Sequence, residues 1–150
     1  MCFGPAAPAL WYSLPEAERN IRAELSSDQC VVDGEHFFVL GRILLPVIDD
    51  SSPFIWLAWV SLSEENFVRS CDLWHTEGRE KEPPYFGWLQ SDLPAYERTT
   101  LNLKATLQTM LVGERPSITL DATDHPLALE QQNGITLARV QKIAEAALHS

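Results

Sequence analysis

Residues 53–67 read PFIWLAWVSLSEENF, and this stretch decides the fold. Every residue from Phe54 to Val60 is apolar, and none of them is glycine or proline. An apolar run of this length, bounded by turn and cap residues, is typical of a strand buried on both faces. Ser61 and Glu64 follow at the spacing of a capping box, and Ser63 is a second candidate for the N-cap. The stretch therefore predicts a central strand that passes directly into a helix.

The segment before this strand predicts a hairpin that pairs with it. Apolar runs at residues 29–32 and 36–47 flank Asp33 and Gly34, and this dipeptide is a strong signal for a tight turn. We expect the second run to pair with the central strand through the polar turn at residues 49–53. Three consecutive antiparallel strands follow from this pattern.

The N-terminal 25 residues predict irregular chain followed by a short helix. Residues 1–12 contain two prolines, and we expect Trp11 and Tyr12 to pin this segment to the body. Ser13 and Glu16 again stand at capping spacing, which predicts a helix from there to about Leu25.

The helix after the central strand is expected to run from about Glu64 to Thr76. Phe67, Cys71 and Trp74 recur at helical spacing and form its apolar stripe. The charged, proline-ended segment 77–84 then reads as the clearest surface loop in the chain.

The C-terminal half predicts three more strands and two helices. They are an aromatic strand at 85–89, a half-exposed strand of alternating pattern at 101–111, a strand at 117–121 with Ile118 and Leu120 facing inward, a helix that opens at Pro126 and ends before Gly134, and a helix from about 137 to 148.

Together these elements predict an α+β fold, a mainly antiparallel β-sheet with helices packed against it, as a single compact domain over residues 1–150. A doubly wound parallel sheet is the weaker alternative, because strands and helices do not alternate regularly.

The formal net charge of −10 limits the class of partner. It opposes binding to nucleic acid or anionic lipid, and no apolar run reaches the roughly 20 residues that span a bilayer. No basic residue precedes Arg19, so the charged start of a signal peptide is missing. We expect a cytoplasmic protein that binds neither nucleic acid nor membrane. Its acidic surface suits a basic protein partner, or it only maintains solubility.

Three widely spaced cysteines, Cys2, Cys30 and Cys71, do not form a disulfide framework. No Cys-x-x-Cys pair occurs, so the sequence predicts neither a metal nor another cofactor. We expect Cys30 and Cys71 to be small core residues.

The best polar cluster is residues 121–126, DATDHP, at a predicted strand-to-helix joint. Backbone N–H groups at such a joint favour anions, and Asp124 beside His125 could orient an imidazole or supply metal ligands. The competing interpretation is a helix cap formed by Thr123 or Asp124. The candidate binding residues here are Asp121, Asp124, His125 and Glu130.

Trp88 is the fifth candidate binding residue. Large aromatic side chains at residues 56–88 either line a groove or fill the core, and Trp88 is expected to be partly exposed because polar residues follow its strand. Gly41 and Gly87 lie inside predicted strands, where glycine marks a bulge or the close approach of another backbone.

Two functional hypotheses remain open. The first is a non-catalytic binding or protein-interaction domain that takes a small molecule or a basic protein, for example an immunity-type protein that blocks a basic toxin. The second is a hydrolase-type enzyme that uses Asp124 and His125. The motifs of a nucleophile elbow, a phosphate-binding loop and a His-Glu-x-x-His zinc site are all missing, which favours the first hypothesis.

Four ordered motifs resemble those of a bacterial family of unknown function, numbered 2199. They are Arg42-x-x-x-Pro46-Val47, residues 59–64 (WVSLSE), residues 85–89 (YFGWL) and residues 123–131 (TDHPLALEQ). The resemblance runs from about Phe3 to His149 and implies no activity, because the family has none assigned. Its members often begin with a Cys-x-x-Cys-Gly and His segment that resembles a zinc knuckle. This chain starts after that point, so we expect no metal site in it.

Overall fold

A computed structural model of the chain describes residues 2–149. In chain order the elements are β1 (Cys2–Phe3), α1 (Ala9–Ser13), η1 (Glu16–Glu18), α2 (Arg19–Arg22), β2 (Ala23–Leu25), β3 (Gln29–Val32), β4 (His36–Leu45), β5 (Phe54–Leu62), α3 (Glu64–Asp72), η2 (Arg79–Lys81), β6 (Tyr85–Leu89), β7 (Lys104–Gln108), β8 (Ser117–Leu120), α4 (Pro126–Asn133) and α5 (Leu137–Leu148).

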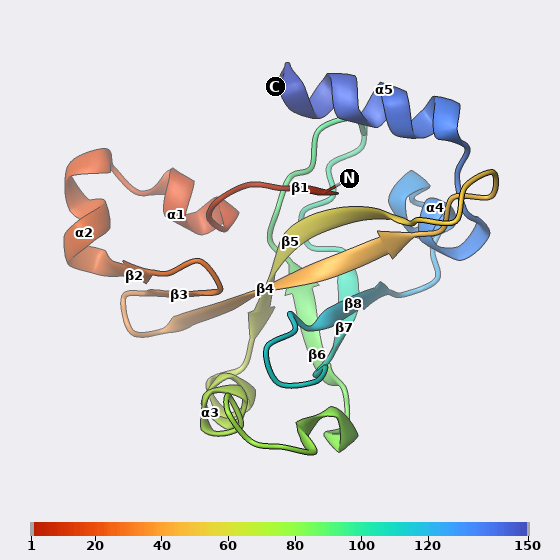
Figure 1. The fold of residues 1–150 in the computed structure, drawn as a ribbon. Coiled ribbons are helices and arrows are strands. Elements are labelled where there is room, and N and C mark those ends of the chain that lie inside the picture. Colours follow the sequence, from red (N-terminus) through yellow and green to blue (C-terminus); the bar gives the residue numbers. More distant parts are fainter. Residues whose placement is uncertain (1, 150) are drawn as a thin grey trace.

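Five of the strands, β4 to β8, close into a barrel (Figure 1). The pairings β4–β5, β5–β6, β6–β7 and β7–β8 are antiparallel, as the sequence predicts. The closing pairing, β4 with β8, is parallel and rests on one register pair, Arg42 with Ser117. The α+β class is therefore confirmed, but the expected open antiparallel sheet is a closed barrel of mixed direction. A pattern of apolar and polar residues reports which face of a strand is buried and carries no signal for closure.

The central strand β5 is buried on both faces, as predicted. Trp56 points into the barrel, and Trp59 points outward beneath the N-terminal segment. Neither side chain is exposed to solvent, because the barrel core encloses Trp56 and a second core outside the barrel wall, to which Leu14 and Cys30 belong, covers Trp59. The N-terminal segment thus covers the outer face of β4 and β5, and the outer face of β6 to β8 carries no such cover (Figure 1).

Helices cover the two ends of the barrel. Phe67 of α3 packs into one end, while Leu127 of α4 and Ile143 of α5 pack into the other. Figure 1 shows α3 and α5 at opposite ends of the molecule. The Ser63 hydroxyl accepts a hydrogen bond from the Asn66 amide at 3.1 Å, so the second of the two candidate N-caps begins α3. None of the helices in residues 2–149 has both the length and the apolar character needed to cross a membrane.

The N-terminal prediction is only partly correct. The helix expected from Ser13 to Leu25 is broken into η1 and α2, and residues 23–25 form the edge strand β2. The expected irregular segment contains α1 and the two-residue strand β1, which pairs in parallel with β5; Met1 lies outside the described residues. Pairing with β3 replaces the helical hydrogen bonds after Arg22, so tertiary context overrides local propensity here.

The helix α3 is shorter than predicted. It ends at Asp72 instead of running to Thr76, and Cys71 is exposed although it was expected in the core. The Cys71 sulfur accepts a hydrogen bond from Gln29 Nε2 at 3.2 Å. Trp74, expected in the apolar stripe, follows the helix and is 41% exposed. Cys30 is fully buried as expected, and burial raises the pKa of its thiol to about 11.

The alternating segment at 101–111 forms a strand over only half its length. β7 covers Lys104–Gln108, and Ala105 and Leu107 face inward as predicted. Beyond Gln108 the chain leaves the sheet, because the carbonyl groups of Met110 and Leu111 accept hydrogen bonds from the Arg79 side chain. The expected strand that contains Ile118 and Leu120, the helix from Pro126 and the C-terminal helix are all present.

Both strand glycines mark close approaches, as predicted. A Cβ atom at Gly41 would lie 2.7 Å from Ile118 Cγ1, and a Cβ atom at Gly87 would overlap the Ser61 carbonyl oxygen. These two positions allow β4 and β8, and β5 and β6, to pack at the distances that the closed barrel needs.

Candidate functional site

The strand-to-helix joint expected around residue 125 is a helix cap formed by the His125 imidazole. Nδ1 accepts a hydrogen bond from the Leu127 amide at 3.0 Å, and α4 begins at Pro126. Nε2 lies 3.0 Å from the Thr99 carbonyl oxygen and 3.2 Å from that of Arg98. Since Nδ1 accepts, the proton sits on Nε2, which donates to these carbonyls. The residue is 2% exposed, so both ring nitrogens are occupied inside the protein.

The two residues expected to cap α4 have other roles. The Thr123 hydroxyl accepts a hydrogen bond from the His125 amide at 3.2 Å. Asp124 lies in solvent, with its side chain 88% exposed, and pairs with Arg98 at 3.3 Å. Asp124 therefore does not contact the His125 ring that it was expected to orient.

Glu130 belongs to a partly buried network that ties α4 and α5 to β5. Its two carboxylate oxygens accept from the Tyr96 hydroxyl and from Arg139 Nε, each at 2.7 Å. The Tyr96 oxygen also accepts from Trp56 Nε1 at 3.0 Å. Burial, and then the Glu130 carboxylate, hold the pKa of Tyr96 well above its usual range. These contacts give Glu130 a structural role.

Trp88 and Asp121 lie on one row across the outer face of the barrel. Trp88 pairs with Lys104, whose carbonyl oxygen accepts from the Asp121 amide at 2.9 Å. Trp88 is 39% exposed, as predicted, and its ring contacts Phe86 edge to face. Of the five candidate residues, Trp88 and Asp121 share this face, Asp124 lies in solvent, and His125 and Glu130 point into packed regions. The five residues do not form one site.

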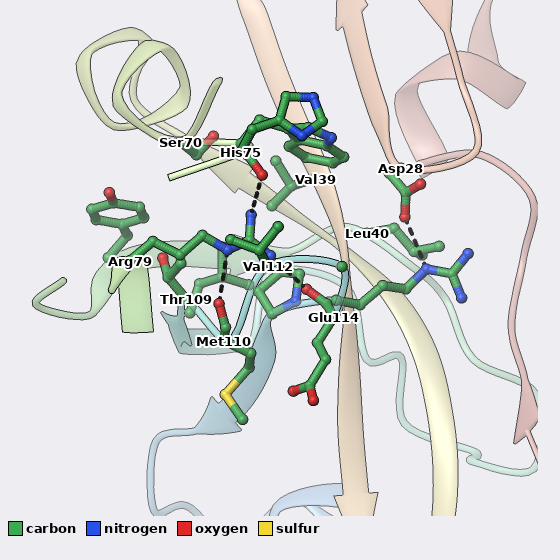
Figure 2. Close-up of a pocket in the computed structure, with 16 residues that line it drawn as sticks. Asp28, Val39, Leu40, Ser70, His75, Arg79, Thr109, Met110, Val112 and Glu114 are labelled. Atoms are coloured by element: carbon green, nitrogen blue, oxygen red, sulfur yellow. Dashed lines mark hydrogen bonds and ion pairs between the residues drawn. The ribbon is translucent and has the colours of Figure 1, made fainter. Parts of the chain in front are cut away.

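A cavity of about 180 Å³ lies elsewhere, at the end of the barrel near α3 (Figure 2). None of the five sequence-predicted residues lines it. Its walls are mainly apolar and come from β4, the chain after α3, β6, β7 and the segment between β7 and β8. The lining includes Asp28, Val39, Trp74, Arg79, Tyr85, Leu107, Met110, Val112 and Arg115.

The cavity exists because β4 changes its neighbour at this point. Along one edge β4 pairs with β3 up to Val39, and then with β8 at Arg42. The Leu40 amide donates to the Asp28 carbonyl at 2.9 Å, and the Arg42 amide donates to a carbonyl just before β8 at 2.9 Å. Asp28 and Arg115 bridge this junction through an ion pair of 2.8 Å. The wall thus opens where two partners meet on one strand edge.

Arg79 forms the inner wall and holds the segment after β7 in place. Its Nε donates to Met110 O at 2.8 Å, and Nη2 donates to Leu111 O at 2.8 Å and Glu114 O at 3.0 Å. Nη1 donates to Trp74 O at 3.1 Å. Figure 2 shows the guanidinium group between these two chain segments. Arg79 is 9% exposed, although the sequence placed it in the clearest surface loop.

Tyr85 links the cavity wall to an ion pair outside it. Its hydroxyl donates to Glu82 Oε1 at 2.8 Å, and Arg69 Nε donates to the same oxygen at 2.8 Å. Burial, and then the Glu82 carboxylate, raise the pKa of Tyr85 to about 12. The hydrogen bonds from Arg69 and then from Tyr85 hold the pKa of Glu82 below its usual range. Glu82 is therefore committed to Arg69 and Tyr85.

The comparison with protein families matches residues 1–135 to a family described as uncharacterised proteins conserved in bacteria, domain of unknown function 2199 (DUF2199). The chain is a member of the DUF2199 family. Neither the curated proteins nor the solved structures contain a significant match to it.

The lining of the cavity of this DUF2199 protein also includes Ser70 and His75. The Ser70 hydroxyl is bonded within α3 to Phe67 O at 2.7 Å. No group of three or more His, Cys, Asp or Glu side chains in residues 2–149 is placed to hold a metal ion. The sequence did not reveal Arg79, Asp28 and Arg115 as site residues, because their partners are backbone carbonyls or distant in the chain.

Proposed function

We propose that this protein is a non-catalytic binding domain whose ligand is a small molecule held in the cavity near α3. The observation that carries the proposal is a cavity of about 180 Å³ with mainly apolar walls and one buried cation. An apolar cavity of roughly 150 Å³ is large enough to bind benzene, so a molecule with one ring fits here. A few polar groups on an apolar wall are the usual composition of a small-molecule site.

The position of His125 supports this function over a hydrolase that uses Asp124 and His125. A general base needs a free nitrogen within reach of the substrate proton. Both nitrogens of the buried ring bond to backbone groups, and Asp124 lies away from them in solvent. This arrangement supports a structural role for the pair.

The experiment is a titration of ¹⁵N-labelled protein with benzyl alcohol, an uncharged probe of the right size, followed by NMR. We expect saturable shifts at amides around the cavity, including Val39 and Leu107. Val112→Trp places a large side chain at the cavity wall and should abolish them. Leu111→Trp is the matched control, because Leu111 immediately precedes Val112 but does not line the cavity. Shifts that survive Val112→Trp, or the absence of saturable shifts both with benzyl alcohol and with its charged analogues benzoate and benzylamine, would refute the proposal.

A basic protein partner is a second candidate function, supported by a groove on the outside of α3. Glu65 and Asp72 line it beside the exposed Val68, and Arg69 and Glu82, which also line it, form an ion pair with each other. The net charge of −10 would steer a basic partner toward such a surface. Binding of an oligolysine peptide, measured by calorimetry, should weaken in Glu65→Lys/Asp72→Lys and with added salt. Affinity unchanged by both would count against it.

A further inference from the structure

The guanidinium group of Arg79 is a buried cation without a carboxylate partner. Five other arginines of residues 2–149 form ion pairs with Asp or Glu side chains, namely Arg22, Arg69, Arg98, Arg115 and Arg139. Among the arginines of residues 2–149, Arg79 is the buried one, and it forms no ion pair within the described chain. Buried charges are normally paired, and a protein of net charge −10 has many carboxylates that could pair with this arginine.

Backbone carbonyls satisfy the hydrogen bonds of Arg79 but do not neutralise it. Four of its five N–H groups donate to carbonyl oxygens, and each carbonyl carries only a partial negative charge. One Nη1 hydrogen has no acceptor among the described residues. A full positive charge and a donor therefore remain at the cavity wall, where the low dielectric strengthens their attraction for an anion.

Two of the other carboxylates near the cavity are already paired. Asp28 pairs with Arg115 at 2.8 Å. Glu82 pairs with Arg69 at 2.8 Å on the far side of Tyr85. Glu114 also lines the cavity and forms no ion pair within residues 2–149, but Figure 2 shows its carboxylate pointing away from the Arg79 guanidinium group, so the remaining donor stays free.

We propose that the cavity selects small aromatic or branched aliphatic carboxylates, with the carboxylate at Arg79 and the apolar body against Val39, Tyr85 and Leu107. This inference rests on the proposed small-molecule function and names the chemical class of its ligand. The body replaces water at apolar walls, and the carboxylate supplies the counter-charge that the fold omits. The Trp74 ring, 6.0 Å from the Arg79 guanidinium carbon, borders the same position.

The test compares benzoate, benzyl alcohol and benzylamine, which share a ring and differ in charge. A hydrogen bond to a charged group predicts that benzoate binds at least about tenfold more tightly than benzyl alcohol, with benzylamine weakest. Added sodium chloride should weaken benzoate binding and leave benzyl alcohol unchanged. The Arg79 Nε–H resonance of the wild-type protein should shift with benzoate and not with benzyl alcohol.

Substitutions test whether the positive charge of Arg79 causes the preference for benzoate. Arg79→Lys keeps the charge and should keep part of the preference, while Arg79→Gln should remove it. Arg98→Gln is the control, because it also removes one positive charge but belongs to an exposed ion pair that does not line the cavity, and this variant should bind benzoate as the wild type does. If the Arg79 variants do not fold, the wild-type comparison and the Nε–H shift decide the question.

The outcomes separate this inference from the function on which it rests. Binding of none of the three probes refutes the proposed function itself. Benzyl alcohol binding as tightly as benzoate overturns the carboxylate inference and leaves the small-molecule function standing. A benzoate preference that survives in folded Arg79→Gln, or disappears in Arg98→Gln, also overturns it.

Discussion

Replacing His125 with alanine should destabilise the protein strongly, because the imidazole bonds to three backbone groups in the interior. The substitution removes the N-cap of α4, which costs about 1 kcal/mol. It also leaves the part-buried carbonyl groups of Arg98 and Thr99 without their donor, which costs about 1–3 kcal/mol. The free energy of unfolding should therefore fall by about 3 kcal/mol. For a chain of this length that loss lowers the Tm by roughly 6–12 °C.

Urea denaturation followed by tryptophan fluorescence measures this loss, and thermal unfolding followed by circular dichroism checks it. Asp124→Ala is the matched control, since an exposed ion pair contributes about 0–1 kcal/mol. His125→Asn should fall between the two, because asparagine is a good N-cap but does not reach the carbonyls. A His125→Ala protein that melts within about 1 °C of the wild type and has lost an enzymatic activity would refute the structural role and restore the hydrolase hypothesis.

Three further predictions concern ionisable groups. The hydrogen bond from Arg69 and then that from Tyr85 lower the folded-state pKa of Glu82, so their stabilisation is lost as the pH falls through that value; Glu82→Gln should flatten the acid limb of a stability–pH profile, and an identical limb would contradict this. Burial raises the pKa of Tyr85 to about 12, so stability should fall as the pH rises from about 10 to 12, and Tyr85→Phe should remove that fall in an alkaline denaturation series. At neutral pH a thiol reagent should modify exposed Cys71 rapidly and spare Cys30 until the protein unfolds; equal rates would contradict the burial of Cys30.

The strands and helices that the sequence predicts correctly are those whose signals are local. The apolar run from Phe54 to Val60 identifies β5, because burial on both faces leaves no polar position in it. Pro126 and Gly134 bracket α4 because each suits the end of the helix where it stands. Asp33 and Gly34 both have positive φ in the predicted hairpin, a conformation that this dipeptide tolerates.

The closure of the barrel depends on contacts that leave no local pattern. Arg42 and Ser117 are far apart in the chain, and their pairing is one parallel register pair. Gly41, which lets Ile118 approach, is the nearest thing to a signal, but it does not name its partner. The sequence therefore predicts the strands and leaves their cyclic order open.

The cavity was missed for a related reason. Arg79 lies in a segment rich in charge and proline, and its acceptors are main-chain oxygens that every residue type has in common. The early end of β7 follows from the same contacts, because Met110 and Leu111 turn their carbonyls toward this side chain instead of a neighbouring strand. The role of a buried arginine of this kind can be recognised only from a structure, which shows the two segments that it joins.

The late position of the closing strand β8 also has a consequence for synthesis. Once residues 36–62 have emerged from the ribosome, the hairpin of β4 and β5 can form, but one edge of β4 has no neighbour at Arg42 until β8 follows. Unpaired edges beside exposed apolar faces are the sites at which nascent chains associate with one another. Emergence of residues 117–120 ends that period, so a chain that stalls before them is the form most in need of a chaperone.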